Sequence, residues 1–145
     1  MSEASTFDSL RAAGWTDLTT EGFTGYVGPF WFRGDAHNHE VGMLVESRHA
    51  NSHIGTLHGG VVMTFADIGL GSAMSKALGA KARGYVTLSL QTQFVSVARV
   101  GEFITCKPEI VRQARDVVFI RGLIKTGEKT IASAEGIWKE MASAR

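Results

Sequence analysis

The segment from Val61 to Leu78 constrains the fold of this chain more than any other, because it is long and almost entirely apolar. It follows two glycines, Gly59 and Gly60, and Gly79 stands where a left-handed helix cap is expected. A helix that is apolar on nearly all sides cannot lie on a surface, so a sheet has to wrap around it. We therefore predict a central helix that starts near Gly59 or Gly60 and runs to Leu78.

The residues after this helix predict the sheet. A period of two over residues 85–94 indicates a half-buried strand, with Val86, Leu88 and Leu90 on one face and Thr87 on the other. Short turns divide the later residues, which implies antiparallel pairing. Three further strands are expected at about 101–112, 116–125 and 129–140.

The residues before the helix predict fewer regular elements. Helical spacing of apolar residues favours a short helix within 5–14. Aromatic and β-branched residues over 23–33 and 39–47 suggest two strands joined by a turn at 34–36, and a loop follows at 47–57. The expected fold class is α+β, with an antiparallel sheet wrapped around one long central helix.

The size and composition predict a single domain. With 145 residues and 44% hydrophobic content, we expect one domain over 1–145 with a short N-terminal extension to about residue 20. The N-terminus lacks the pattern of a signal peptide, so a cytoplasmic location is expected. The single Cys106 cannot form an internal disulfide, and its apolar neighbours indicate a core position. Polar residues interrupt the helical segment, which favours a buried helix over a membrane span.

The charge distribution is uneven, although the net charge is only +1. Residues 1–75 carry a charge of −5 and residues 76–145 a charge of +6. Cations of the second half could favour an anionic ligand, or could be dispersed over a solvated sheet face. No basic cluster is interleaved with aromatic residues, so nucleic acid is not an expected partner.

Asp67 is the only formally charged side chain between Arg48 and Lys76. A carboxylate on so apolar a helix costs on the order of several kcal/mol unless it is hydrated, paired or used in chemistry. Two glycines at the start of the helix leave backbone N–H groups approachable, and the helix dipole adds positive potential there. The helix therefore carries a candidate base or nucleophile and, at its start, a candidate oxyanion site.

The distance between these two features has a consequence for assembly. The rise from Gly59 to Asp67 is ~12 Å, so one carbonyl cannot readily reach both. If two copies of the helix lie antiparallel across a two-fold axis, the N-terminus of one meets Asp67 of the other. This geometry favours a site shared between two chains. A carboxylate with no catalytic role and glycines that serve only close helix packing are the alternatives.

These residues resemble a known family. Gly-Thr-Leu-His-Gly-Gly at 55–60, with Asp67 nine residues after His58, is similar to the hotdog-fold thioesterases of the phenylacetyl-CoA thioesterase type. The run from Val86 to Glu102 resembles the strand and turn that follow the helix in that family, and the resemblance extends over roughly 40–140. It implies a hotdog fold, in which a curved antiparallel sheet wraps around the long central helix, and a homodimer or dimer of dimers. It also implies hydrolysis of an acyl-CoA thioester without any cofactor besides the CoA of the substrate.

The resemblance also implies roles for individual residues. The Gly59 N–H would polarise the thioester carbonyl and stabilise the oxyanion, and Asp67 of the other chain would be nucleophile or general base. Thr87 would help to orient the attacking water, and His58 would shape the site by hydrogen bonding. Contacts to the CoA moiety would come from Gly60 and Arg99.

Two positions differ from the family pattern. Many relatives have an asparagine six residues before the histidine, where this chain has Ser52, with Asn51 one step earlier. Either Asn51 reaches the site through a local shift or Ser52 substitutes for it. The usual Arg-Pro-Ala-Arg stretch is Ser96-Val97-Ala98-Arg99 here, so only the last arginine keeps its place as a CoA contact.

Other functions are weighed against the same residues. A hydratase or dehydratase of the same fold typically needs a histidine working with an acid, whereas position 67 offers only the acid. A noncatalytic acyl-CoA binding protein would not need the combination of Asp67, the glycines and Thr87. His37, His39 and Glu40 resemble a set of metal ligands, but we expect them to be solvated polar residues beside a turn.

Overall fold

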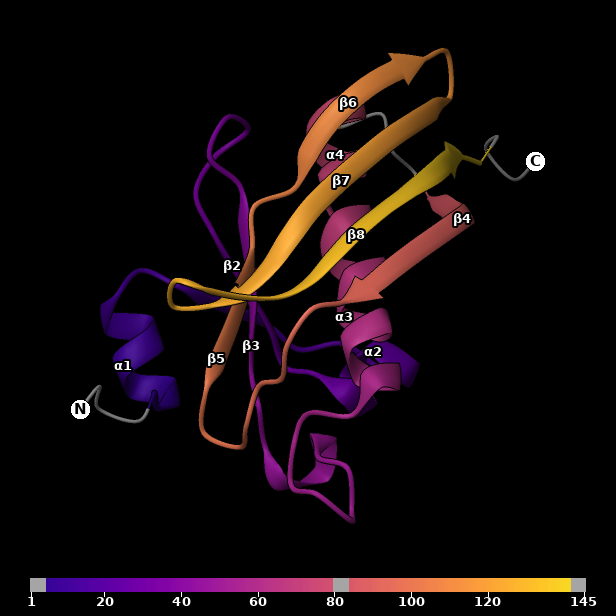
Figure 1. The fold of residues 1–145 in the computed structure, drawn as a ribbon. Helices are drawn as coiled ribbons and strands as arrows, with labels where there is room; N and C mark the ends of the chain where they lie inside the picture. Colours follow the sequence, from indigo (N-terminus) through magenta and orange to yellow (C-terminus); the bar gives the residue numbers. More distant parts are fainter. Residues whose placement is uncertain (1–4, 80–83, 142–145) are drawn as a thin grey trace.

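The computed structural model describes residues 5–79 and 84–141. Within them, eight strands form one antiparallel sheet that curves around a long central helix (Figure 1). The helices are α1 (Phe7–Ala12), α2 (Gly22–Val27), α3 (Gly59–Gly71) and α4 (Ala73–Leu78), with a 3-10 turn at Ser47–His49. The strands are β1 (Thr16–Leu18), β2 (Phe30–Arg33), β3 (Glu40–Leu44), β4 (Tyr85–Phe94), β5 (Phe103–Cys106), β6 (Glu109–Ala114), β7 (Val117–Thr126) and β8 (Lys129–Glu140).

The central helix is confirmed, and it is interrupted once. It begins at Gly59, and α3 and α4 are separated at Ser72, whose Oγ donates to the Gly69 carbonyl at 2.6 Å. Back-bonding of a serine to the preceding turn commonly bends a helix. The helix ends at Leu78, and Gly79 has a φ of +64°, a backbone conformation that favours glycine.

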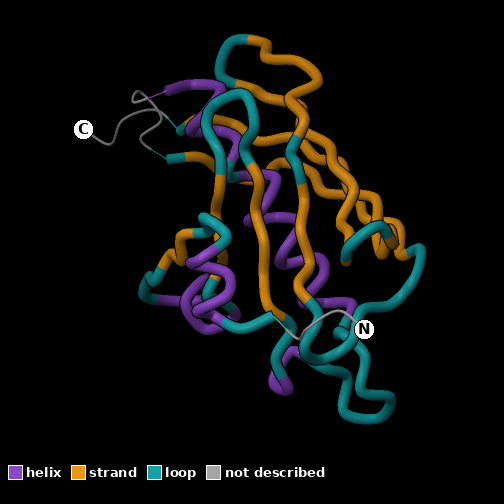
Figure 2. The backbone as a smooth tube through the Cα atoms, turned by 90° about the vertical axis from the view of Figure 1, so that its left-hand side faces the viewer, coloured by secondary structure: helices purple, strands orange, loops and turns teal. Residues whose placement is uncertain are grey.

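The sheet has the order β1-β2-β3-β5-β7-β8-β4, with β6 paired to β7. Figure 2 shows its strands running beside the helix. Glycines let the helix come close: a Cβ at Gly69 would lie 2.9 Å from Val41 Cγ1, and one at Gly71 would lie 2.9 Å from Trp138 Nε1. The length and composition of Gly59–Leu78 would allow a membrane span, yet its buried residues belong to this core.

The N-terminal residues pack against the end of the sheet. The predicted helix within 5–14 is confirmed as α1, and the strand pair β2–β3 is confirmed as antiparallel. Leu10 and Trp15 form a small second core with Trp31, and β1 adds an edge strand beside β2. Phe30 stacks on Phe65 of α3, so the neighbouring Trp31 and the N-terminal residues around it lie on the face of β2 that points away from the central helix.

The prediction of a strand over 23–33 is wrong in its first half, because Gly22–Val27 form α2. Tertiary contacts override the local β preference here. The Arg48 guanidinium donates to the Tyr26 and Gly28 carbonyls, and the His49 ring hydrogen-bonds to the Val27 carbonyl. These contacts satisfy the carbonyls at the end of α2, which a strand would have used in a ladder.

The single strand predicted over 101–112 is two strands in the structure. Pro108 separates β5 from β6, because proline lacks the N–H that a continuous ladder needs. The later segments are confirmed as β7 and β8, joined by a turn in which Gly127 has a φ of +56°.

Strand β4 lies at the edge of the sheet and, among the described strands, pairs with β8 alone. Its register shifts between Thr87 and Ser89, so a bulge interrupts the expected alternation. The prediction of a half-buried strand with Val86, Leu88 and Leu90 on one face is wrong in the single chain. Leu90 packs on the core, whereas Val86 and Leu88 are 41% and 55% exposed.

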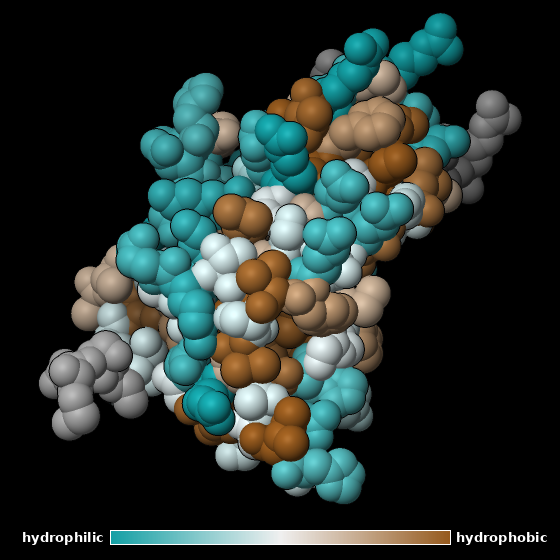
Figure 3. Space-filling model, in the orientation of Figure 1, coloured by the Kyte–Doolittle hydropathy of each residue, from teal (hydrophilic) through white to brown (hydrophobic). Residues whose placement is uncertain are grey.

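The outer face of the sheet is mixed in character. Figure 3 shows apolar surface among polar side chains over the strands that face the viewer. Four large apolar side chains of β6 and β7 are exposed: Ile110, Val111, Phe119 and Leu123. The Arg121–Glu109 ion pair, with a distance of 3.0 Å, lies on the same two strands.

Gly136 provides a test of how tightly the sheet is packed. A Cβ there would lie 2.6 Å from ring carbons of Trp138 and 2.7 Å from the Ser89 carbonyl oxygen. Because backbone cannot move away easily, we expect Gly136→Ala to lower the free energy of unfolding by about 1–3 kcal/mol, measured by chemical denaturation. Lys139→Ala on the same strand is the control, with an expected change within about 0.5 kcal/mol. Equal effects of the two variants would contradict this packing.

Candidate active site

The start of α3 is built by His58 and the two glycines. His58 is the N-cap residue, and its Nδ1 accepts the Gly60 N–H at 2.8 Å. A Cβ on Gly60 would lie 3.0 Å from that nitrogen, so glycine lets the ring fold over the helix end. In the described part of the chain, no protein acceptor receives the Gly59 N–H. This donor is therefore available to an external oxygen.

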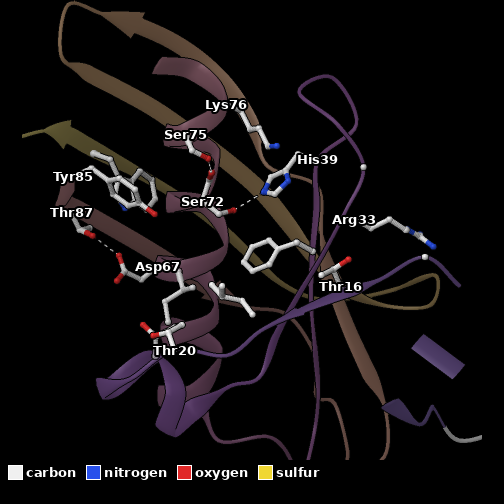
Figure 4. A pocket seen from close by; sticks show the side chains of 17 residues that line it. Thr16, Thr20, Arg33, His39, Asp67, Ser72, Ser75, Lys76, Tyr85 and Thr87 are labelled. Carbon is white, nitrogen blue, oxygen red and sulfur yellow. Dashed lines mark hydrogen bonds between the residues drawn. The ribbon is translucent and has the colours of Figure 1, made fainter. Parts of the chain in front are cut away.

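Asp67 lies about two turns further along α3 and is partly buried. The Thr87 hydroxyl of β4 donates to Asp67 Oδ1 at 2.5 Å (Figure 4). The bulge after Thr87 explains how this side chain turns towards the helix while Leu90 also packs inwards. Because a hydroxyl keeps acceptor capacity after donating its proton, Thr87 can also hold a water molecule beside the carboxylate.

Asp67 and Thr87 line a cavity of about 810 Å³ that is bounded by the central helix, by β1 and β2, and by the start of β4. We call it the Asp67 cavity. Its apolar walls include Phe32, Ile68 and Trp138. The polar side chains come both from the central helix and from the segments that face it (Figure 4). They comprise Thr16, Thr20, Thr24, Arg33, His39, Ser72, Ser75 and Lys76 in addition to Asp67 and Thr87.

Tyr85 is a cavity residue that the sequence analysis missed. Burial, and to a lesser extent the charge of Asp67, raise the pKa of the Tyr85 phenol. The phenol is therefore neutral at pH 7 and can donate a hydrogen bond inside the cavity. The available signal was its position two residues before Thr87, which places both side chains on one face of a strand.

The loop before the helix holds Asn51 and Ser52 away from Asp67 in the same chain. Asn51 Oδ1 accepts the His53 N–H at 3.0 Å, and the Asn51 backbone pairs with Thr56 and Gly55. Ser52 is exposed in the turn. Neither residue lines the Asp67 cavity, so both belong to the end of the molecule that carries the start of α3.

Arg99 lies at this same end of the molecule. Its backbone forms an isolated bridge with Thr56, and its side chain is exposed. Within the chain, the start of the helix therefore carries Arg99, His58, Gly59 and Gly60, whereas Asp67 lies with Thr87 further along. The structure brings the predicted residues together as two groups rather than one.

His49 is a second residue that the sequence analysis missed. Its side chain is 2% exposed, and its Nδ1 accepts the Glu46 N–H at 3.0 Å while Nε2 lies 2.6 Å from the Val27 carbonyl oxygen. Burial is the main cause that lowers the pKa of His49, so the ring is held neutral. Its own carbonyl accepts the His58 N–H at 2.9 Å, which ties α2 to the start of α3.

The other candidate groups have structural roles. His39 bonds to Ser72, and Glu40 pairs with Arg33 and Lys107. No group of three potential metal ligands occurs among the described residues. Burial raises the pKa of the Cys106 thiol to about 12, which suits a core residue and not a nucleophile.

The coupling between Tyr85 and Asp67 can be measured directly. Asp67→Asn removes the charge that opposes ionisation of the phenol, so we expect the pKa of Tyr85 to fall in this variant. It should stay above the ordinary value of a phenol in water, because burial is the larger cause. Tyrosinate absorbance against pH, recorded in a Tyr26→Phe background, makes the measurement. An unchanged titration would contradict the placement of the phenol beside the carboxylate.

The sequence matches a known family over most of this site. Residues 54–133 match the thioesterase superfamily. The chain is 34% identical over 113 residues to the "Putative esterase PA0474" of Pseudomonas aeruginosa, covering 77% of this chain and 83% of that protein. It is also 34% identical over 79 residues to "Acyl-coenzyme A thioesterase 13" of Mus musculus, covering 53% of each chain.

Solved structures share the fold. Zebra fish thioesterase superfamily member 2 superposes with a TM-score of 0.73 at 25% identity, over 84% of this chain and 88% of that one. The phenylacetic acid degradation protein PaaI of Thermus thermophilus superposes with a TM-score of 0.64 at 19% identity, over 92% and 99%. The predicted hotdog fold is confirmed, and this chain belongs to the thioesterase superfamily as a thioester hydrolase.

Proposed function

We propose that this protein is an acyl-CoA thioesterase that releases a free acid and CoA. The observation that carries the proposal is the hydrogen-bonded pair of Asp67 and Thr87 on the wall of a partly apolar cavity. The name of the mouse relative supports CoA as the thiol of the substrate. The enzyme acts in the cytoplasm and needs no cofactor.

The proposed chemistry uses Asp67 in one of two ways. As a general base, the carboxylate takes a proton from water while the water oxygen bonds to the thioester carbon. As a nucleophile, Asp67 bonds to that carbon itself, and water then cleaves the resulting anhydride. In both routes the C–S bond breaks and the CoA thiolate is protonated. Thr87 orients the water, and the Gly59 N–H stabilises the negative charge on the carbonyl oxygen.

The proposed site is shared between two subunits of a homodimer. Gly59 and Asp67 are separated by ~12 Å along one helix, which is too far for one thioester carbonyl. An antiparallel neighbour would bring the Gly59 of one chain to the Asp67 of the other. The free edge of β4 and its exposed Val86 and Leu88 offer a surface for such a neighbour. Two of these dimers could associate further as a dimer of dimers.

The loop and the start of the helix have supporting roles in this proposal. His58 holds the first turn by accepting the Gly60 N–H, so Gly59 supplies the free donor. Asn51 shapes the turn before it through its bond to His53, and Ser52 lies exposed in that turn. Arg99 is exposed near the same loop, where its charge can meet a phosphate of CoA. Gly60 lets the CoA moiety approach the backbone.

The geometry gives less support to a hydratase or dehydratase. Asp67 is paired with a threonine, and the histidine of the same cavity, His39, is bonded to Ser72 on another part of the wall. His58 is engaged in capping the helix. A noncatalytic acyl-CoA binding protein would not require a carboxylate held by a hydroxyl in this cavity.

The role of Asp67 has a direct test. Asp67→Asn keeps the shape of the side chain but removes its basicity, so we expect the rate of thiol release from acyl-CoA esters to fall by about 10²–10⁴-fold. Asp116→Asn at an exposed turn is the matched control and should keep full activity. Circular dichroism checks that both variants are folded. Full activity in the folded Asp67→Asn variant would show that Asp67 is neither the general base nor the nucleophile.

The shared site has a separate test in mixed dimers. Gly59→Pro removes the proposed oxyanion donor, and proline is tolerated at the first helical position. His58 already has a φ of −65° and a ψ of 134°, which suits a residue before proline. We expect each of Gly59→Pro and Asp67→Asn to be inactive alone and to recover about a quarter to a half of the wild-type activity per dimer when mixed.

The control for this experiment is Gly59→Ala, which keeps the N–H. Its Cβ would lie 3.5 Å from the Phe94 ring, an ordinary contact, so activity should be retained. Subunit exchange is verified with differently tagged chains. Exchange without any recovery of activity would contradict a site shared in this way.

A further inference from the structure

The two ends of the Asp67 cavity differ in chemistry. One end carries the Asp67 carboxylate and its Thr87 partner. Along the helix towards α4, the wall carries His39, Ser72, Ser75 and Lys76, which Figure 4 shows gathered at the opposite end. The proposed thioester chemistry uses only the first end. The second end has no role in the hydrolytic step.

The hydrogen bonds at the second end fix the state of its histidine. Ser72 Oγ has one proton and donates it to the Gly69 carbonyl at 2.6 Å, so it accepts from His39 Nε2 at 2.7 Å. Burial, and then the charge of Lys76, lower the pKa of His39. The His39 ring is thus neutral, and it stacks on Phe32 with 5.8 Å between ring centroids. These two side chains form a fixed wall rather than a charged group.

The charge at this end comes from Lys76. The Arg33 guanidinium and Lys107 share the Glu40 carboxylate at 3.3 Å and 3.9 Å. Lys76 forms no ion pair with the residues that the structure describes, although it is near enough to His39 to affect its pKa. These four side chains together carry an excess of positive charge.

The nearby acid Asp35 does not remove this excess. The pKa of Asp35 is lowered first by the N–H groups of His37 and Asn38, with Lys76 a weaker cause. Asp35 Oδ1 accepts both of these N–H groups, at 2.8 Å and 3.0 Å, so the carboxylate is held in its own turn. Arg33, Lys76 and Lys107 against Asp35 and Glu40 sum to one positive charge, and of these five residues Arg33 and Lys76 line the cavity.

We propose that the cavity takes acyl groups that end in a carboxylate, with the Lys76 ammonium binding that carboxylate. This inference rests on the proposed function, which places the thioester carbonyl at Asp67. The rise from Asp67 to Lys76 is ~13 Å, and the lysine side chain can reach back along the helix, so a medium-length chain spans the two. Phe32, Ile68 and Trp138 cover the methylene groups between the ends. Lys76 is exposed, so its ammonium attracts a carboxylate that stays in contact with solvent at the mouth of the cavity.

The kinetic experiment compares octanoyl-CoA with octanedioyl-CoA, which differ only at the far end of the acyl group. In the wild type we expect kcat/KM to be higher for octanedioyl-CoA by about tenfold or more. Lys76→Met should abolish this preference and leave octanoyl-CoA hydrolysis unchanged. Lys139→Met, which removes the same charge outside the cavity, should keep the preference. Wild-type enzyme that favours octanoyl-CoA, or a preference that survives Lys76→Met, would overturn the inference.

A binding experiment separates this inference from the proposed function. The thioethers S-octyl-CoA and S-(carboxyheptyl)-CoA cannot be hydrolysed, so their Kd values from titration calorimetry do not depend on catalysis. We expect the carboxylated thioether to bind more tightly by about tenfold in the wild type and equally in Lys76→Met, with a preference that weakens as salt is added. Equal Kd values in the wild type would refute a carboxylate site. Failure of the proposed function would instead appear as no thiol release from any acyl-CoA.

Discussion

The structure depends on the burial of one apolar helix by a curved sheet. The helix packs against β3, β4, β7 and β8, with Gly69 and Gly71 allowing close contact, and the two ends of the sheet are β1 and β4. The remaining gap is where Asp67 lies, partly buried and bonded to Thr87. The sheet therefore buries the apolar sides of the helix and leaves the side that carries Asp67 partly open. This arrangement avoids the cost of burying an ionised carboxylate completely.

Much of this arrangement could be predicted from residue patterns. The apolar run after Gly60 predicts the helix, and the turns near Arg115 and Gly127 predict the antiparallel pairing of the last strands. Asp67 stands out because an isolated carboxylate on an apolar helix needs a partner. These features depend on local periodicity and on single residue types, which a sequence displays directly.

Other features depend on contacts between distant segments. The helical form of α2 requires Arg48 and His49, which lie about twenty residues further along the chain. The bulge in β4 cannot be read from the alternation of its residues, yet it turns Thr87 towards Asp67. The hydrogen bond from the Gly60 N–H to His58 Nδ1 likewise depends on the orientation of the imidazole ring, which the sequence does not display. The sequence offers Asp67 and Thr87 as candidate residues, but it shows neither Tyr85 beside them nor the hydrogen bond that joins them.

The hydrogen bond between Thr87 and Asp67 joins an edge strand to the central helix, and these two elements differ in how many neighbours hold them in place. Asp67 belongs to the central helix, whereas Thr87 belongs to a strand that, among the described strands, has β8 as its one neighbour. Edge strands with a single ladder open more readily than interior elements. The contact between the Asp67 carboxylate and the Thr87 hydroxyl therefore depends on how firmly the β4–β8 ladder, and any neighbour on the open edge of β4, holds this strand against the central helix.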